Sequence, residues 1–509
     1  MTLESILHEH SPVPSKVMKD LIAGGTFLES IAKAPYSWEA FAVQAQAQQS
    51  YSPETRDVVV RALERQNANL SPSEEASLKA FRNGALTITT GHQLMVCGGT
   101  VFFEAKVLGA VALAKAATAE LGIDVVPVFW MATEDHDFEE IASFRIGAHK
   151  FTWEKPDAKG PVGYLPTNDL ADQLSSWLEK VPLNEAQKKL VQPRLQAYRD
   201  CKNLAEATRQ WVRQWAEGLG LLVLDGQDLA LKSHAGSIWS AEMEGQYSKL
   251  IQEQTEVLVA HGYKAQVFPR DINLFDLRDG DRRRIEKPDA ECPYFYVSPN
   301  ALMRPLYQEW LLPNLAYVGG GGELAYWLQL GSAFEKLGRP MPLLYLRNSF
   351  LVQEAKLTKD LAKLGISLLE LLETNGEALK QNLLGKNTVL QAEGESLQAP
   401  LMEAIGHWNT SLLEHYPELE QHAAALKVKM EKLAQRTAET RYRAQKRRHE
   451  ELMQSVDRAI EAAYPGGTFW ERRASYLDLV GILGLDPRDA MVEKMSTIKA
   501  GTVVIHPNF

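Results

Sequence analysis

Five short apolar runs that alternate with helical segments constrain the fold of this chain most. They read ALTIT at 85–89, DVVPVFWMAT at 124–133, GLLVLDG at 220–226, LAYVGG at 315–320 and PLLYLRN at 342–348. Runs that are apolar on both faces and separated by helices are typical of a parallel sheet in an α/β domain. In such a sheet, ligands bind beyond the carboxyl ends of the strands, where the strand order reverses. The polar residues that follow these runs are therefore the candidates for a functional site.

The rest of the chain divides around this core. A length of 509 residues suggests about three units. We expect a helical segment packed on the core at 1–84, the α/β core at 85–352 with insertions at about 150–300, a helical region at 353–463, and a tail at 464–509 that packs on the core. Leu419, Ala423, Leu426, Met430 and Leu433 follow the break at Tyr416-Pro417 with coiled-coil spacing. This predicts an antiparallel coiled-coil hairpin at about 395–463.

The composition argues against several classes of partner. The net charge of -10 disfavours a nucleic-acid partner, although short basic runs occur at RDGDRRR and RAQKRRH. The three cysteines lack metal-ligand spacing, so we assign no metal site and expect a cytoplasmic protein. No window is apolar over the length of a membrane span, and the N-terminus lacks the apolar core of a signal peptide, so we expect no membrane partner.

Glycine turns separate the first run from the helix that follows it. Gly91 and the pair Gly98-Gly99 precede VFFEAKVLGAVALAKAA. Such glycines leave N–H groups free at a helix N-terminus, where an anion is stabilised, although a tight turn without a ligand explains them equally well. Lys106, about two turns into the helix, is a candidate contact for a phosphate or carboxylate, or a solvated lysine.

An acidic cluster around one histidine follows the second run. Glu134, Asp135, His136 and Asp137 stand at the carboxyl end of the expected strand. Neighbouring carboxylates raise the pKa of a histidine and orient its ring. Such a group can take a proton from an attacking amine, bind an ammonium group or ligate a divalent metal. The alternative is an acid-rich helix N-terminus, which the helix dipole favours but which explains the histidine poorly.

A second glycine loop follows the fourth run. Gly319, Gly320, Gly321 and Gly322 lead into a helix at Glu323. Four successive glycines are costly in entropy, so we expect a backbone N–H site that a ligand approaches closely. Arg304, upstream of this loop, is a candidate fork for a carboxylate or phosphate, or an ordinary surface arginine.

Several segments together resemble the cysteine-adding enzyme family of bacillithiol biosynthesis. They are GHQ, GGTVFFEAK, PVFWMATEDHDFEEI, RPLYQEWLLPNLAYVGGGGELAYW and PLLYLRNS, followed by the helical hairpin. The resemblance implies a Rossmann-like core, similar to class I aminoacyl-tRNA synthetases and nucleotidyltransferases, and a homodimer supported by the coiled coil. The implied substrates are L-cysteine and glucosaminyl-malate, joined through an amide bond.

The resemblance also implies where the site residues lie. One side of the pocket would be lined by Gly91, His92, Gln93 and Lys106, the floor by Glu134 to Asp137, the opposite wall by Arg304 with Gly319 to Glu323, and the end of the last strand by Arg347 and Ser349. The HIGH sequence of class I synthetases is absent, and GGTVFFEAK occupies its place. Whether ATP, ADP or Mg²⁺ takes part is therefore left open.

Amide formation needs an activated carboxylate and a neutral amine. We expect the glycine loops with Lys106 or Arg304 to hold the anionic group. We expect His136, held by Asp135 or Asp137, to deprotonate the amine, with His92 as a further catalytic residue. Two other functions stay open: nucleotidyl or phosphoryl transfer on the same fold, and a nucleotide-binding coiled-coil assembly protein.

Overall fold

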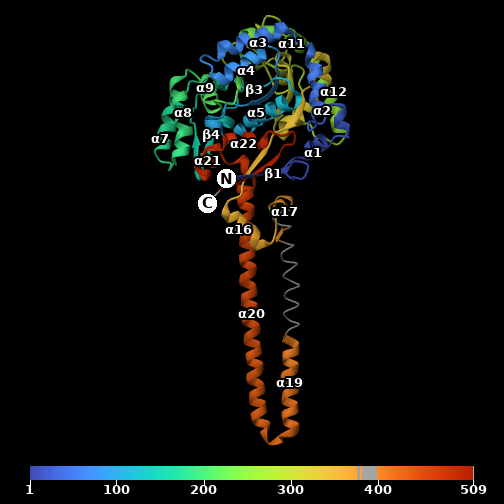
Figure 1. Cartoon of the computed structure of the whole chain (residues 1–509), viewed down its shortest axis with the longest axis vertical. Coiled ribbons are helices and arrows are strands. Elements are labelled where there is room, and N and C mark those ends of the chain that lie inside the picture. Colours follow the sequence, from blue (N-terminus) through green and yellow to red (C-terminus); the bar gives the residue numbers. More distant parts are fainter. Residues whose placement is uncertain (375–378, 381–397, 508–509) are drawn as a thin grey trace. The chain divides into compact units, whose positions relative to one another are not determined.

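The computed structural model describes residues 1–374, 379–380 and 398–507 and divides into two compact units. The first unit combines Met1–Val352 with Phe469–Phe509, and the second is Gln353–Thr468 (Figure 1). No helix within the described ranges combines the length and the apolar character that a membrane span needs.

A parallel five-stranded sheet forms the centre of the first unit. Its strands, in spatial order, are β11 (Leu343–Leu346), β10 (Asn314–Gly319), β2 (Leu86–His92), β3 (Val125–Met131) and β6 (Leu222–Asp225). All four neighbouring pairs are parallel. Numbered along the chain within this sheet and read from the β6 edge, the strand order is 3-2-1-4-5, as in a Rossmann fold, and it reverses between β2 and β10. All five predicted runs are strands of this sheet, so the α/β prediction is confirmed.

Helices cover both faces of the sheet because successive side chains of each strand point to opposite sides. On one face, Val125 packs with Ala110, Leu113 and Ala117 of helix α5 (Phe102–Leu121). On the other face, the next residue, Val126, packs in a separate core with helices α3 (Pro53–Gln66) and α4 (Pro72–Arg82). The two cores make the unit a three-layer sandwich, whose layers can be followed in Figure 1.

Two long insertions follow the carboxyl ends of β3 and β6. Between β3 and β6 lie α6 (Phe138–Ile141), β4 (Ser143–Ile146), β5 (His149–Thr152), α7 (Asn168–Leu178), α8 (Glu185–Asp200) and α9 (Leu204–Trp215). Between β6 and β10 lie α10 (Leu229–His234), α11 (Gly236–Met243), α12 (Gln246–Ala260), β7 (Leu274–Asp276), β8 (Arg283–Arg284), β9 (Val297–Pro299) and α13 (Met303–Leu311). Strands β8, β7 and β9 form a small antiparallel sheet of their own.

The two ends of the chain meet in a second sheet. Strand β1 (Thr2–Leu7) pairs antiparallel with β13 (Gly501–His506), which pairs in parallel with β12 (Ser349–Val352). The expectation that 1–84 is helical is therefore wrong for its first residues, although α1 (Lys16–Ala23), α2 (Trp38–Ala47), α3 and α4 follow. The tail also contributes α21 (Tyr476–Leu483) and α22 (Arg488–Met495) to this unit.

The second unit contains a helical hairpin. Helix α19 (Gln398–His415) and the 44-residue α20 (Glu420–Ala463) run antiparallel, as Figure 1 shows, and 3-10 helix η7 (Pro417–Leu419) joins them. Helices α16 (Ala355–Leu364) and α17 (Leu368–Glu373) precede the hairpin, and Asp360 of α16 forms an ion pair with Arg458 of α20. Residues 395–397 of the predicted hairpin lie outside the described residues.

The predicted seam of the hairpin is only partly correct. Ala423 is buried, but Leu433 is 63% exposed and its neighbour Ala434 is buried instead. Ala423 and Ala434 are 11 residues apart, a spacing that fits a nearly straight helix better than a strict seven-residue repeat does.

Candidate functional site

A cavity of about 650 Å³ lies at the carboxyl ends of β2, β3 and β10. It therefore occupies the point where the strand order reverses, as expected for a ligand site in a fold of this kind. Eleven of the predicted site residues line it: Gly91, His92, Gln93, Lys106, Glu134, Asp135, Arg304, Gly320, Gly321, Gly322 and Glu323. Seven others are not among its lining residues: His136, Asp137, Gly98, Gly99, Gly319, Arg347 and Ser349.

Gly91 allows a close approach between neighbouring strands at the reversal point. Its N–H donates to the hydroxyl of Tyr317 on β10 at 3.2 Å. A Cβ atom at this position would lie 3.1 Å from that hydroxyl and 3.5 Å from a guanidinium nitrogen of Arg304. A larger residue would therefore push Tyr317 and Arg304 away from the end of β2.

Lys106 and Glu323 join the two glycine segments. The buried ammonium of Lys106 donates to the carbonyl of Gly91 and to Glu323 at 2.6 Å. Burial lowers the pKa of Lys106, and the neighbouring carboxylate opposes this shift. Burial would raise the pKa of Glu323, but Lys106 and Arg304 outweigh it and lower the pKa. The carboxylate is therefore held in its ionised form.

Glu323 also occupies the position that we expected a ligand anion to take. It is the N3 residue of α14 (Gly321–Trp327), and it accepts the N–H of Gly320 at 3.4 Å. The start of this helix is thus capped by a side chain of the protein. The glycines still serve the cavity, because a Cβ atom added at Gly322 would meet no other atom within 4 Å, so the wall stays open there.

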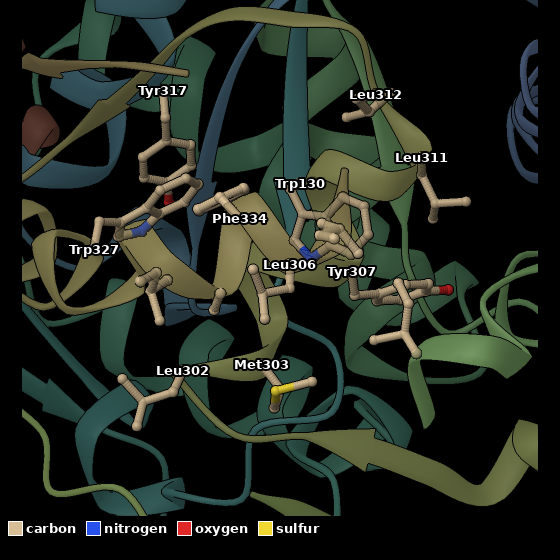
Figure 2. Close-up of a cluster of buried hydrophobic side chains, with 14 of the residues drawn as sticks. Trp130, Leu302, Met303, Leu306, Tyr307, Leu311, Leu312, Tyr317, Trp327 and Phe334 are labelled. Atoms are coloured by element: carbon tan, nitrogen blue, oxygen red, sulfur yellow. The ribbon is translucent and has the colours of Figure 1, made fainter. Parts of the chain in front are cut away.

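Arg304 lies against aromatic residues at the same wall. Its guanidinium donates to Gln308 at 2.8 Å and lies 3.6 Å from Glu323. Tyr317 stacks on Trp327 with ring centroids 4.2 Å apart, and Figure 2 shows both rings within the buried cluster. Trp130 and Tyr307, also drawn in Figure 2, belong to the same cluster and line the cavity. The guanidinium of Arg304 therefore lies against packed aromatic rings at this wall of the cavity.

Glu134 lies on the acidic floor and has a buried partner. Lys232 of α10 is fully buried and donates to Glu134 at 2.6 Å. Burial lowers the pKa of Lys232, and Glu134 opposes the shift. The ion pair fixes one carboxylate oxygen of Glu134 and leaves the residue on the cavity wall.

Asp135 and Glu140 share one neutral donor. The side-chain nitrogen of Gln93 donates to Asp135 at 2.7 Å and to Glu140 at 2.8 Å. Burial would raise the pKa of Asp135, but the hydrogen bond from Gln93 and the charge of Arg282 lower it overall. Arg282 lies 4.0 Å from Asp135, so of these two carboxylates only Glu140 has no cationic partner within the described residues, and it contributes negative charge to this part of the cavity.

His136 lies at the rim with its acceptor nitrogen already in use. Arg282 has only donors, and its guanidinium lies 3.1 Å from Nδ1 of His136. Nδ1 therefore accepts a hydrogen bond, and a neutral ring protonated at Nε2 is favoured. This geometry does not support the expectation that His136 takes the proton of an amine. Asp137 instead caps α6, accepting the N–H of Glu140 at 3.3 Å.

His92 presents the opposite tautomer. Its Nδ1 lies 3.1 Å from the carbonyl of Gln93, which can only accept, so Nδ1 carries the proton. Burial and then the charge of Lys106 lower the pKa of His92 to about 3. The ring is neutral at physiological pH, and its Nε2 is available as a hydrogen-bond acceptor.

The second glycine turn has a structural role. A Cβ atom at Gly98 would lie 2.5 Å from Glu104, and Gly99 has φ +66° and packs on Met95. Glu104 pairs with the buried Arg194 at 3.0 Å. Burial raises the pKa of Cys97 in the same turn to about 12, so this thiol is not a nucleophile at neutral pH. The expectation that Gly98 and Gly99 bind a ligand is not supported.

The end of β11 is also closed by protein groups. Arg347 forms a buried ion pair with Glu471 of the tail at 2.7 Å, and Ser349 is a buried residue of β12. A Cβ atom at Gly319 would lie 2.6 Å from Leu324, which explains that glycine through packing alone. These three residues support the site from outside the cavity.

Several cavity residues were missed from the sequence. They are Phe102, Lys232 behind the floor, Phe268, Arg270, Arg282, Arg284 and Arg472. The run RDGDRRR contains Arg282 and Arg284 and was the available signal, but it was interpreted only as a weak nucleic-acid feature. Within the described part of the chain, no group of three or more His, Cys, Asp or Glu side chains is arranged to hold a metal ion.

The fold and the site define a Rossmann-like α/β protein with a polar cavity at the strand-order reversal and a coiled-coil hairpin unit. Residues 1–296 and 293–348 match the family described as Bacillithiol biosynthesis BshC, N-terminal Rossmann-like domain. Residues 350–506 match Bacillithiol biosynthesis BshC, C-terminal coiled-coil domain. The chain belongs to the BshC family of bacillithiol biosynthesis.

Curated relatives agree with this assignment. Proteins named "Putative cysteine ligase BshC" from Flavobacterium johnsoniae, Christiangramia forsetii and Cytophaga hutchinsonii are 35%, 29% and 31% identical to it. The matches cover 72%, 92% and 84% of this chain and 74%, 92% and 84% of the relatives. A solved tyrosyl-tRNA synthetase from Leishmania major aligns over 58% of this chain and 32% of its own at 13% identity, with a TM-score of 0.23, too low to compare the folds.

Proposed function

We propose that this protein is a ligase that joins the carboxyl group of L-cysteine to the amine of glucosaminyl-malate through an amide bond. The family assignment supports a cysteine ligase. The observation that carries the reaction is the polarity of the cavity. Carboxylates that suit an ammonium group, Glu134, Asp135 and Glu140, face the same space as the guanidinium of Arg304 and the neutral acceptor of His92.

The reaction needs a co-reactant, because a free carboxylate is a poor acyl donor. A nucleoside triphosphate would convert the carboxylate of cysteine into an acyl phosphate or acyl adenylate. The amine then attacks the acyl carbon, the C–N bond forms, the C–O bond to phosphate breaks, and the phosphate or nucleotide leaves. Before this attack the substrate ammonium gives one proton to a carboxylate of the floor, and the second proton, released as the amide forms, leaves with the phosphate or nucleotide.

Glu134 is the carboxylate that we propose for this role. Lys232 holds it in place, and it needs no rearrangement to face the ligand. His92 accepts a hydrogen bond through Nε2, and Arg304 stabilises the negative charge that develops on the acyl group. His136 positions Arg282 at the rim.

The test is to incubate the full-length protein with cysteine and glucosaminyl-malate, with and without ATP and Mg²⁺, and to analyse the products by mass spectrometry. We expect the mass of the conjugate, together with AMP or ADP in the complete mixture. Release of nucleotide without a conjugate would instead indicate nucleotidyl or phosphoryl transfer. A lack of both products would contradict the proposal.

We further propose a homodimer that forms through the hairpin of the second unit. The hairpin exposes large apolar side chains in the single chain, including Leu401, Val428 and Leu433. A coiled coil commonly buries such residues against another copy. Light scattering after gel filtration would give twice the mass of the chain.

A further inference from the structure

Among the described residues, three exposed arginines that line the cavity have no hydrogen bond or ion pair through their guanidinium groups; Arg472 packs on the ring of Phe102, and the other two, Arg270 and Arg284, lie in the insertion between β6 and β10. Arg270 lies in the loop between α12 and β7, and Arg284 lies on β8. Both line the cavity and both are exposed. Within the described residues, neither guanidinium has a hydrogen bond or ion pair, whereas Lys106, Arg282 and Arg304 of the same cavity are all held by protein groups.

The acidic residues of this insertion neutralise other arginines. Asp276 and Asp289 pair with Arg278 at 2.8 Å and 2.5 Å. Asp279 and Asp281 pair with Arg283 at 2.7 Å and 3.4 Å. Neither Arg278 nor Arg283 lines the cavity. The charge compensation is therefore on the outer side, and the cavity side of the insertion stays positive.

The pairing register places Arg284 on the same face of the small sheet as Phe275, which lines the cavity. Arg284 lies directly opposite Phe275 across β7 and β8, and Phe275 lines the cavity. Cross-strand partners share one face of a sheet. Arg282 covers the same ring, with its guanidinium carbon 4.1 Å from the ring centroid. Arg283, the next residue of β8, points to the opposite face because successive strand residues alternate.

An exposed aromatic residue stands next to these arginines. Phe268 is 77% exposed and lines the cavity. Its loop is fixed on one side by Gln329, which donates to the carbonyl of Val267 at 2.8 Å, and on the other by Asn273, which accepts the N–H of Arg270 at 3.1 Å. The apolar ring is thus presented at the mouth, where it can pack on a ligand ring and shield the guanidinium groups from water.

We propose that Arg270 and Arg284 form a subsite for the two carboxylates of the malate group of glucosaminyl-malate, with Phe268 packing against the sugar. This rests on the proposed function and orients its acceptor substrate. The cavity is basic at the mouth and acidic at the floor, so a molecule with a dicarboxylate at one end and an ammonium group at the other fits in one direction. The amine then faces Glu134, and cysteine occupies the space near Arg304 and His92.

The test compares Arg284→Gln and Arg270→Gln with Arg283→Gln, which removes the neighbouring charge outside the cavity. We expect each cavity variant to raise the KM for glucosaminyl-malate about tenfold or more, the loss of one charge-assisted pair. The kcat and the KM for cysteine stay near the wild-type values, and Arg283→Gln changes neither constant. With methyl glucosaminide, which lacks malate, the wild type and all three variants have the same KM.

Calorimetry with L-malate and with tripolyphosphate tests the subsite even if the protein does not ligate cysteine. The wild type binds malate, and Arg284→Gln weakens that binding about tenfold while its melting temperature stays unchanged. A wild-type KM in both cavity variants would overturn the subsite. So would the loss of tripolyphosphate binding alone, which would assign these arginines to a nucleotide.

Discussion

At the scale of single residues, protonation states follow from burial and from the partner of each polar atom. His92 and His136 show this clearly, because a carbonyl fixes the proton on Nδ1 of His92 and a guanidinium excludes it from Nδ1 of His136. The sequence placed both histidines at strand ends, but it could not reveal their partners. The choice between them and Glu134 as the proton acceptor therefore depended on the structure.

Glu134→Gln tests the assignment of the proton acceptor. Removing the carboxylate charge abolishes the proton acceptor and leaves Lys232 buried beside a neutral amide, so we expect kcat to fall at least about 100-fold. His136→Gln, which keeps a polar side chain at the rim, changes kcat only a few-fold. Steady-state kinetics of both variants gives the comparison, and equal losses would return His136 to the role of base.

His8 makes the stability of the first unit depend on pH. The ring is 1% exposed, Nε2 donates to the carbonyl of Arg347 at 3.0 Å, and burial lowers the pKa to about 4. The unfolded chain takes up a proton below about pH 6.5, and the folded protein does so only near pH 4. Stability is therefore lost as the pH falls through this window, by about 2 kcal/mol from pH 7 to pH 5.

His8→Gln keeps a donor for the carbonyl of Arg347 and removes the titration. We expect its melting temperature to fall less between pH 7 and pH 5 than that of the wild type. Thermal unfolding followed by circular dichroism at both pH values measures the difference. Parallel curves for the two proteins would contradict the role of His8.

At the scale of elements, the loop before α14 connects the glycine pattern to an internal ion pair. Four glycines after a strand correctly indicated a wall of a cavity, since Gly320, Gly321 and Gly322 line it. The sequence did not show that Glu323 caps the helix itself, because the N-cap residue is Gly320, which has no side chain to form the other half of a capping box. The ion pair between Glu323 and Lys106 could not be predicted from the sequence, because only the fold places Lys106 of α5 beside Glu323.

A double-mutant cycle on Lys106 and Glu323 tests this connection. Glu323→Gln leaves the buried ammonium without a counter-charge, so we expect a loss of about 3 kcal/mol in the free energy of unfolding. Adding Lys106→Met to that variant restores part of the stability, although activity stays low. Urea unfolding of the four proteins gives the coupling energy, and additive effects would show that the pair does not act as a unit.

The burial pattern of each strand, and the distance along the chain to its partner, explain which strands could be predicted from the sequence. The five runs of the central sheet are buried on both faces, so their composition alone identified them. Strand β1 reads TLESIL, with mostly exposed residues, and its partner β13 lies at the other end of the chain. Two strands from opposite ends of the chain leave no local sequence pattern from which their pairing could be predicted. The arginines of the mouth were visible as a basic run, but only the register of β7 and β8 separates Arg284 from Arg283.

At the scale of the whole molecule, the cavity draws on one compact unit alone. Its lining residues come from 91–326 and from Arg472, all within the first unit. The hairpin belongs to the second unit and contributes no residue to the cavity. We therefore expect catalysis and assembly to be separable.

Removing the hairpin tip, residues 405–434, and closing the gap with a short glycine–serine turn tests this separation. The shortened protein keeps the kcat and both KM values of the full chain, and light scattering gives the mass of a monomer. A shortened protein that melts at the same temperature but has lost activity would show that the hairpin takes part in the reaction.

We propose that cysteine and glucosaminyl-malate are joined in the cavity at the reversal of the strand order. Gly322 offers the most direct test, because it lines that cavity and a Cβ atom added there would meet no protein atom within 4 Å. Gly406, on the hairpin, has equally open surroundings and serves as the control. Conjugate formation by Gly322→Trp and Gly406→Trp is measured by mass spectrometry beside their melting temperatures. We expect Gly322→Trp to melt like the wild type and to form no conjugate, and Gly406→Trp to form the conjugate at the wild-type rate. If Gly322→Trp still makes the conjugate at the wild-type rate, the reaction does not take place in this cavity.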